Sequence, residues 1–188
     1  NDDLDCTVAF EYLTRGIRVQ SAWHPLLKME WVSGQPLDGY VRSHLKDSAA
    51  LIALANNLQR MLREMHANGI AHGDLQHGNI IVTEAAKIRL VDYDGMYVPS
   101  LAGHNCPELG HRNYQHPGRT AKHFGPYLDN FAAWSIYVSL VCLSRDPLLL
   151  DELQGGDECL LFRIFDYKNP TRSRAFAALE RHTDPEIR

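Results

Sequence analysis

The sequence has no excess of basic residues, no long apolar run and no paired cysteine motif. Its 188 residues include 19 Lys and Arg against 23 Asp and Glu, which gives a formal net charge of −4. A net charge of this sign offers no electrostatic reason to bind a polyanion, so we do not expect nucleic acid as a partner. The longest uncharged apolar stretch, residues 131–143, is too short to cross a bilayer, and we expect no membrane segment in this chain.

The cysteines and the first residues bear on where the protein acts and how complete it is. Cys6, Cys106, Cys142 and Cys159 are scattered without CxxC spacing, which indicates reduced thiols and a cytoplasmic location. A hydrophobic fraction of 45% is enough for the core of one domain, or of most of one. No Met opens the chain and a strand-like pattern begins within ten residues, so we expect that a preceding part is missing.

The first third of the chain predicts two strands followed by helices. Residues 9–19 and 26–32 have the composition of an antiparallel strand pair, joined by a turn-like stretch that ends at Pro25. A short helix is predicted over residues 37–45. Ser48 is the predicted N-cap of a long helix, whose apolar side chains recur at helical spacing.

The rest of the chain predicts a hairpin, a long loop and further helices. Residues 80–83 and 87–91 are β-branched runs that predict a tight hairpin. Residues 99–126 have little periodicity, and loops of that length in compact domains are usually functional. Residues 129–143 are apolar nearly all round, as in a buried helix. Strands first and helices afterwards indicate an α+β fold.

The densest group of polar residues flanks the predicted hairpin. It consists of His72-Gly73-Asp74-Leu75-Gln76-His77-Gly78-Asn79 and Asp92-Tyr93-Asp94-Gly95. Residues that enter and leave an antiparallel hairpin are neighbours, so we expect Asn79 and Asp92 to converge. Their oxygens, with Asp94 nearby, are the hard ligands that Mg²⁺ prefers. Asp74 could accept a proton from an attacking hydroxyl.

This pattern resembles the protein-kinase-like superfamily, and the resemblance extends over most of the chain. The kinase signature places Asn five residues after the catalytic Asp, followed by Asp-Phe-Gly. Here Asn79 lies five residues after Asp74, and Asp92-Tyr93 stands where Asp-Phe is expected. The resemblance implies ATP and Mg²⁺ as cofactors, Asp74 as the catalytic base, and Asn79 and Asp92 as metal ligands, with Asp94 as a further candidate.

The resemblance also implies a nucleotide site and a division into lobes. Met29 would be the gatekeeper of the hinge, the backbone of Glu30 and Val32 would face adenine, and Ile81 would lie beneath the base. His72 and Tyr93 would pack in the column that links the lobes, and Asp129 would brace the catalytic loop. The implied division is 1–32 as the remnant of an N-terminal lobe, 33–36 as hinge and 37–188 as a helical C-terminal lobe, with an activation segment over 96–126.

Departures from the kinase pattern lie close to the predicted catalytic base. Gly73 replaces the arginine that would anchor a phosphorylated loop, and Gln76 replaces a lysine that would neutralise the transferring phosphate. The glycine-rich loop, the strand lysine and its helix glutamate are not visible before Ala9. His72-Gly73-Asp74 is similar to the loop of aminoglycoside and choline phosphotransferases.

We therefore expect an ATP- and Mg²⁺-dependent phosphotransferase, specifically a bacterial-type Ser/Thr protein kinase. The long segment over residues 96–126 favours a protein substrate, and a cognate phosphatase is a further candidate partner. His72-Gly73-Asp74 favours the alternative of a small-molecule kinase. Gln76 and the missing lysine favour a pseudokinase that binds or scaffolds without transferring phosphate.

Simpler structural roles are open for each of these residues. Asp74, Asn79 and Asp92 are residue types common in turns and caps, and Asp-Gly at Asp94 is a common turn pair. Gln76 is either a substrate contact or a solvated loop residue, and Met29 and Ile81 could be core residues. Four residues of the long loop could be considered as zinc ligands: His104, Cys106, His111 and His116. Their spacing matches no tight ligand pattern, so we expect them to be exposed.

Overall fold

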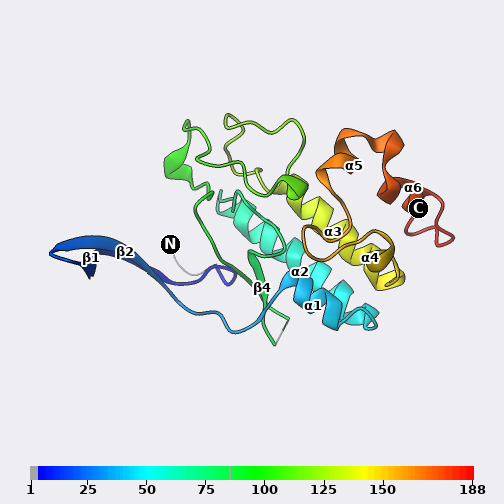
Figure 1. The fold of residues 1–188 in the computed structure, drawn as a ribbon, viewed down its shortest axis with the longest axis horizontal. Coiled ribbons are helices and arrows are strands. Elements are labelled where there is room, and N and C mark those ends of the chain that lie inside the picture. The colour runs from blue at the N-terminus through cyan, green and yellow to red at the C-terminus, as the bar shows by residue number, and fades with distance from the viewer. Residues whose placement is uncertain (1–3, 85) are drawn as a thin grey trace.

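A two-stranded hairpin projects from a mainly helical body in the computed structural model, which describes residues 4–84 and 86–188 (Figure 1). The hairpin pairs β1 (Phe10–Val19) with β2 (Ala22–Met29) in antiparallel register. The predicted pair is therefore confirmed, but the turn is shorter than predicted, because the chain reverses at Gln20 and Ser21, where Gln20 adopts a φ of 54°, and β2 already begins at Ala22. Pro25 lies inside β2. It stands opposite the stretch of β1 between Leu13 and Ile17, where the register of the two strands shifts, and a proline is tolerated at such an irregularity.

A second, three-stranded sheet lies within the body. Its order is β3 (Gln35–Pro36), β4 (Ile80–Val82) and β5 (Ile88–Leu90), all antiparallel. The predicted hairpin is formed by β4 and β5. The predicted hinge, residues 33–36, contributes β3, because Gln35 and Pro36 pair with the edge of β4.

The core of the body lies between two long helices. The first helices are α1 (Leu37–Ser43) and α2 (Ser48–Ala67), and α2 packs against α3 (Asn130–Arg145). Buried side chains of α2 recur at helical spacing: Leu51, Leu54, Leu58, Met61 and Met65. The predicted N-cap is wrong by one residue, because the Asp47 side chain accepts the N–H of Ala50 at 3.0 Å and Ser48 is the first helical residue.

A long loop joins β5 to α3, and short helices complete the chain. The loop contains the 3-10 helices η1 (Pro99–Leu101) and η2 (Arg112–Tyr114). After α3 come α4 (Leu149–Glu152), α5 (Ile164–Lys168), η3 (Pro170–Arg172) and α6 (Arg174–Glu180). The C-terminal helices lie at the end of the molecule opposite the hairpin (Figure 1). The predicted α+β class is thus confirmed, although β4 and β5 follow α1 and α2 in the chain.

Two further observations concern expectations from the composition. Over residues 4–84 and 86–188, no helix combines the length and the apolar character needed to span a bilayer. All four cysteines are buried free thiols. Cys106 was expected to be exposed in the long loop, and this is wrong, because the loop folds back and buries it.

The α2–α3 contact gives a direct stability prediction. Leu54 is fully buried on α2, whereas Ile52 on the same helix is 36% exposed. Leu54→Ala should lower the free energy of unfolding by about 2–5 kcal/mol, because a buried cavity adds to the lost transfer free energy. Ile52→Ala should cost roughly 1 kcal/mol or less. Equal losses for the two variants in denaturant unfolding would contradict the assigned core face.

Candidate active site

The segment between α2 and β4 is held in place by a buried carboxylate. Asp129, directly before α3, accepts the backbone N–H of His72 through Oδ2 at 2.5 Å and that of Gly73 through Oδ1 at 2.8 Å. Burial raises the pKa of Asp129, and the two N–H donors oppose that rise by stabilising the charged form. The bracing contact expected for Asp129 is therefore present. Its carboxylate makes no capping bond to α3 itself.

Asp74 and Asn79 are in direct contact. The side-chain amide of Asn79 donates from Nδ2 to the carbonyl oxygen of Asp74 at 2.9 Å and to its Oδ2 at 3.2 Å. Asn79 is buried and Asp74 is half-buried. Because both donor contacts use Nδ2, the Oδ1 of Asn79 remains as an acceptor for a ligand.

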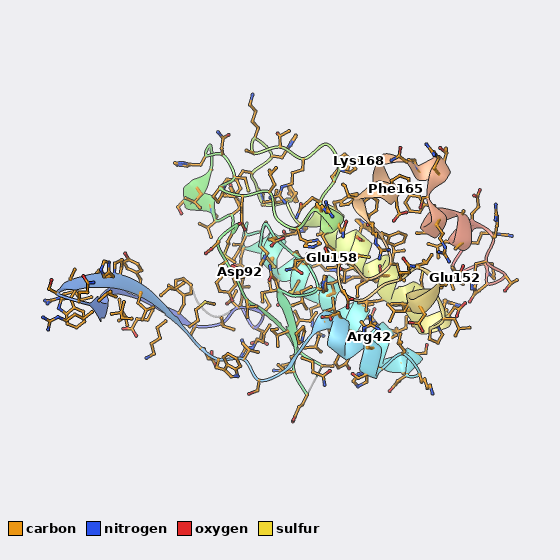
Figure 2. The ribbon with its side chains drawn as sticks, in the orientation of Figure 1. Arg42, Asp92, Glu152, Glu158, Phe165 and Lys168 are labelled. Carbon is orange, nitrogen blue, oxygen red and sulfur yellow. The ribbon has the colours of Figure 1, made fainter. Side chains whose placement is uncertain are left out.

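Asp92 lies across the hairpin from Asn79. The N–H of Val91 donates to the carbonyl oxygen of Asn79 at 3.0 Å, which continues the ladder to the residue before Asp92. Asp92 has a φ of 66°, in the left-handed region that costs a non-glycine residue about 1–2 kcal/mol. Such strain is concentrated at functional sites. Figure 2 shows Asp92 on the side of the body from which the hairpin projects.

The donor set around the hairpin is chemically suited to a hard cation. Asp92 and Asp94 are exposed carboxylates, and Asn79 supplies a carboxamide oxygen, the ligand types that suit Mg²⁺. In the part of the chain that the structure describes, no three His, Cys, Asp or Glu side chains form a ready-made metal site.

Two glycines bring the segment between α2 and β4 against the segment after β5. Gly73 has a φ of +84°, and a Cβ at this position would lie 2.0 Å from the carbonyl oxygen of Gly95. The arginine that the kinase pattern places at this position therefore has no room here. Next to this contact, the rings of His72 and Tyr93 meet edge to face at 5.9 Å, as expected of neighbours in a packed column.

Gln76 is turned toward its own loop. Its Oε1 accepts the backbone N–H of Gly78 at 2.6 Å. The side-chain oxygen is thus used to fix the loop between Asp74 and Asn79, and the amide Nε2 is the group that could meet a ligand.

The residues expected at the nucleotide site are only partly brought together. Ile81 is the middle residue of β4, and a Cβ on Gly34 would lie 2.7 Å from its Cγ2, so residues 33–36 pass directly over it. Met29 and Val32 are half-buried. The N–H of Glu30 donates to the carbonyl oxygen of Ala9 at 2.9 Å, which commits this residue's N–H to the hairpin ladder.

The long loop covers the predicted catalytic base, a contact that sequence reasoning missed. The backbone N–H of His111 donates to Asp74 Oδ1 at 2.6 Å, and a Cβ on Gly110 would lie 2.6 Å from the same oxygen. Partial burial raises the pKa of Glu108, and the carboxylates of Asp74, Asp92 and Asp94 raise it further. The sequence of the aperiodic loop did not predict the contact of the His111 N–H with Asp74, because every residue except proline has a backbone N–H.

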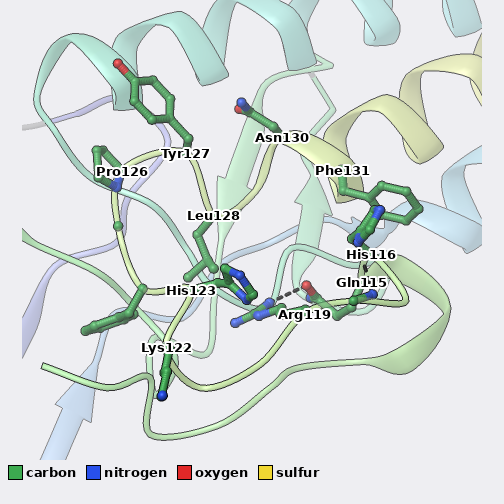
Figure 3. Close-up of a pocket in the computed structure, with 13 residues that line it drawn as sticks. Gln115, His116, Arg119, Lys122, His123, Pro126, Tyr127, Leu128, Asn130 and Phe131 are labelled. Atoms are coloured by element: carbon green, nitrogen blue, oxygen red, sulfur yellow. Dashed lines mark hydrogen bonds between the residues drawn. The ribbon is translucent and has the colours of Figure 1, made fainter.

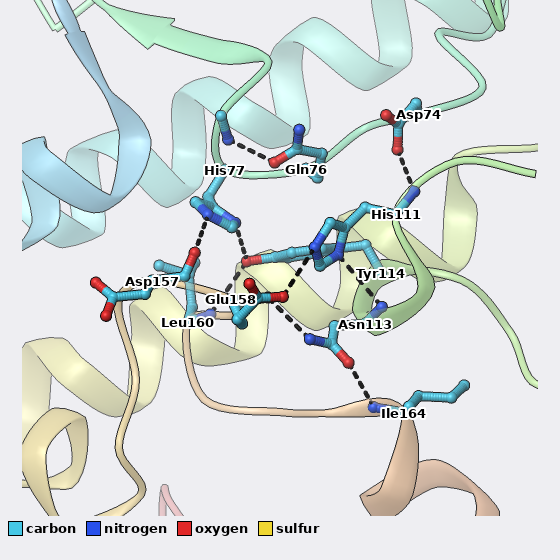
Figure 4. Close-up of polar contacts among 11 residues, drawn as sticks. Asp74, Gln76, His77, His111, Asn113, Tyr114, Asp157, Glu158, Leu160 and Ile164 are labelled. Carbon is cyan, nitrogen blue, oxygen red and sulfur yellow. Dashed lines mark hydrogen bonds and ion pairs between the residues drawn. The ribbon is translucent and has the colours of Figure 1, made fainter.

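A second polar network connects the long loop with His77 and with residues 157–158 (Figure 4). His77 Nε2 lies 2.9 Å from the carbonyl oxygen of Asp157, and His77 Nδ1 lies 2.8 Å from the hydroxyl of Tyr114. A carbonyl only accepts, so Nε2 carries the proton and Nδ1 accepts from Tyr114. Burial lowers the pKa of His77, which favours this neutral form. Asn113 joins the network by donating to the carbonyl oxygen of Glu158 at 2.9 Å.

A pocket of about 630 Å³ lies beside the long loop (Figure 3). It is lined by residues from 115 to 131, among them Arg119, Lys122, Phe124 and Phe131. No residue that the sequence assigned to the nucleotide or metal site lines it.

Comparison with known proteins finds similarity to kinase-like proteins. The ABC1 atypical kinase-like domain matches residues 17–100. The chain is 27% identical over 165 residues to "Calcium-dependent protein kinase 9" of Oryza sativa subsp. japonica. The aligned region covers 82% of this chain and 28% of that protein. It is 27% identical over 131 residues to "Calcium-dependent protein kinase 10" of Arabidopsis thaliana, covering 68% of this chain and 24% of the relative.

A shorter match completes the comparison. "Probable serine/threonine-protein kinase mkcC" of Dictyostelium discoideum is 30% identical over 67 residues, 36% of this chain and 8% of that protein. The chain spans only about a quarter of the length of the calcium-dependent kinases. Together these matches support the protein-kinase-like superfamily, and the α+β architecture is consistent with a kinase-like fold.

The glycine contact predicts a position-specific cost. Gly73→Ala should lower the free energy of unfolding by about 2 kcal/mol or more, because the added methyl group would collide with the carbonyl oxygen of Gly95. Gly103 is the matched control, since its φ is +85° and an added Cβ meets none of the described atoms within 4 Å. Gly103→Ala should cost only the backbone strain, about 1 kcal/mol. Thermal unfolding that ranks the two variants equally would rule out the close approach.

The His77 network predicts a stability that depends on pH. Because the pKa of His77 is below its ordinary 6.5 in the folded state, the unfolded state binds more protons as pH falls through that value. The free energy of unfolding should therefore decrease from pH 7 downward through this window. His77→Gln should reduce the dependence of the free energy of unfolding on pH. His104→Gln, at an exposed position, should retain the dependence of the wild type. Parallel pH profiles of all three proteins would contradict a buried neutral His77.

Proposed function

We propose that this chain carries the active site of an ATP- and Mg²⁺-dependent phosphotransferase, specifically a Ser/Thr protein kinase. The observation that carries the proposal is the contact between Asp74 and Asn79, with Asp92 following across the hairpin ladder. A base, a carboxamide and a carboxylate in this arrangement match the needs of phosphoryl transfer, which depends on positioning and on neutralising charge.

Each side chain has a role that its contacts support. Asp74 accepts the proton of the attacking hydroxyl, and its carboxylate is oriented by Asn79 and by the N–H of His111. Asn79 Oδ1, Asp92 and Asp94 hold Mg²⁺. When bound, the cation neutralises charge on the phosphate oxygens. Gln76 offers its amide Nε2 to the transferring phosphate.

The nucleotide and the acceptor are assigned to opposite sides of these residues. Met29, the backbone of Glu30 and Val32, and Ile81 form the proposed adenine site at the start of the body. Residues 96–126 form the proposed acceptor-binding segment, because they pass over Asp74 and are long enough to hold an extended protein segment. This argument favours a protein hydroxyl over a small molecule.

A pseudokinase is the second candidate, and a specific observation favours it. Both carboxylate oxygens of Asp74 already accept hydrogen bonds from within the chain, and Gln76 is turned onto Gly78. A protein that only binds nucleotide could keep this closed arrangement. The two candidates differ in whether the loop over Asp74 opens to an acceptor.

Transfer of radiolabelled γ-phosphate from ATP tests the proposal. The purified protein should label itself or a generic protein substrate in the presence of Mg²⁺. Asp74→Ala and Asp92→Ala should each reduce the rate by about 100-fold or more, in the range that general base and charge-stabilising groups supply. Asp151→Ala, in an exposed position on α4, should leave the rate unchanged.

The outcomes separate the candidates. Label transfer that survives unchanged in both Asp74→Ala and Asp92→Ala would show that the site is assigned wrongly. Binding of Mg²⁺-ATP without any transfer would favour the pseudokinase. Transfer to an aminoglycoside or choline but to no protein would favour a small-molecule kinase.

A further inference from the structure

Arg119 joins the long loop to the catalytic loop. Its Nη1 donates to the carbonyl oxygen of Gly73 at 2.8 Å and to Oε1 of Gln115, and the latter bond is drawn in Figure 3. Its Nη2 lies 3.3 Å from Sγ of Cys106 and 3.5 Å from the carbonyl oxygen of Glu108. One guanidinium thus bridges three segments: the residue before Asp74, residues 106–108 in the middle of the loop, and the turn that carries Arg119 itself.

The hydrogen-bond acceptors of Arg119 differ from the group on which its charge acts, because its charge lowers the pKa of the buried Asp129 and thereby opposes the effect of burial. Its acceptors are two carbonyl groups, an amide oxygen and a thiol sulfur, all uncharged. Its Nε is buried and has no hydrogen-bond partner within residues 4–84 and 86–188. A planar fork of fixed donors is the feature of arginine that lysine lacks.

The bridge leads directly to the catalytic base. Arg119 holds Cys106 and Glu108, and the same loop then delivers the N–H of His111 to Asp74 Oδ1 at 2.6 Å. On the opposite side, Asp129 holds the N–H of Gly73. The peptide before Asp74 is therefore fixed through its N–H by α3 and through its carbonyl by Arg119.

The Gly73 position explains why the anchor comes from a distant residue. A side chain there would collide with Gly95, so the loop cannot be anchored by an arginine next to Asp74. We propose that Arg119 is the positioning residue that sets the distance between the long loop and Asp74, and thereby the productive orientation of the base. This inference rests on the proposed phosphotransferase function.

Steady-state kinetics of Arg119 variants test the inference. Arg119→Gln should lower kcat for phosphoryl transfer by about 10- to 100-fold, the size of effect that misplacement of a reacting group by about 1 Å produces. The KM for ATP should change by less than about twofold, because the nucleotide residues are elsewhere. Arg174→Gln is the matched control, since Arg174 is an exposed arginine at the start of α6 and outside the proposed site, and it should behave as the wild type.

Arg119→Lys distinguishes geometry from charge and also serves if Arg119→Gln fails to fold. Lysine keeps the positive charge but reaches fewer acceptors, so kcat should stay well below the wild-type value. Full activity in Arg119→Lys would show that charge alone suffices and would overturn the inference. Full activity in Arg119→Gln would overturn it as well.

Hydrogen exchange provides a readout that does not need catalysis. In Arg119→Gln the amides of Gly73 and His111 should exchange faster than in the wild type, while amides in the middle of α2 should not change. Unchanged exchange at Gly73 and His111 would overturn the inference. A wild-type protein that transfers no phosphate but shows the faster exchange in the variant would refute the proposed function and leave the bridge by Arg119 supported.

Discussion

The arrangement of the site depends on one buried carboxylate. Asp129 satisfies the N–H groups of His72 and Gly73, and loss of its acceptors would leave two buried donors unpaired at roughly 1–3 kcal/mol each. Asp129 is fixed at the start of α3, and α3 packs on α2, whose C-terminal end leads into the loop it braces. The ordinary hydrophobic contact of two helices thereby sets the position of Asp74.

A second constraint, the contact of Gly73 with Gly95, decides how the charges are distributed. It brings Asp74 near the carboxylates that follow β5. Burial raises the pKa of Glu108, and repulsion from Asp74, Asp92 and Asp94 raises it further. The exposed carboxylate of Asp92 is accessible to a cation, which under the proposed function would offset this charge. The formal charge of −4 fits this account, because the phosphates would be neutralised locally rather than by a basic surface.

Much of this architecture could be predicted from the sequence where local patterns determine it. Helical spacing identified α2, and a run that is apolar nearly all round identified α3. The β-branched runs around a short turn identified the hairpin that places Asp92 beside the Asn79 strand end. Details that depend on contacts between distant residues could not be predicted. The role of Arg119 and the N–H of His111 on Asp74 arise from the folding of an aperiodic loop, and the two-residue strand β3 exists only because β4 offers an edge.

The most direct test of the account is a crystal structure of the protein with Mg²⁺ and a non-hydrolysable ATP analogue. The account predicts a cation bound by Asn79 Oδ1 and the Asp92 carboxylate at about 2.0–2.1 Å, with the phosphates facing Asp74. It also predicts the base of the nucleotide against Ile81. A nucleotide whose metal contacts neither Asn79 nor Asp92, for example one held in the pocket beside Arg119 and Phe131, would contradict it.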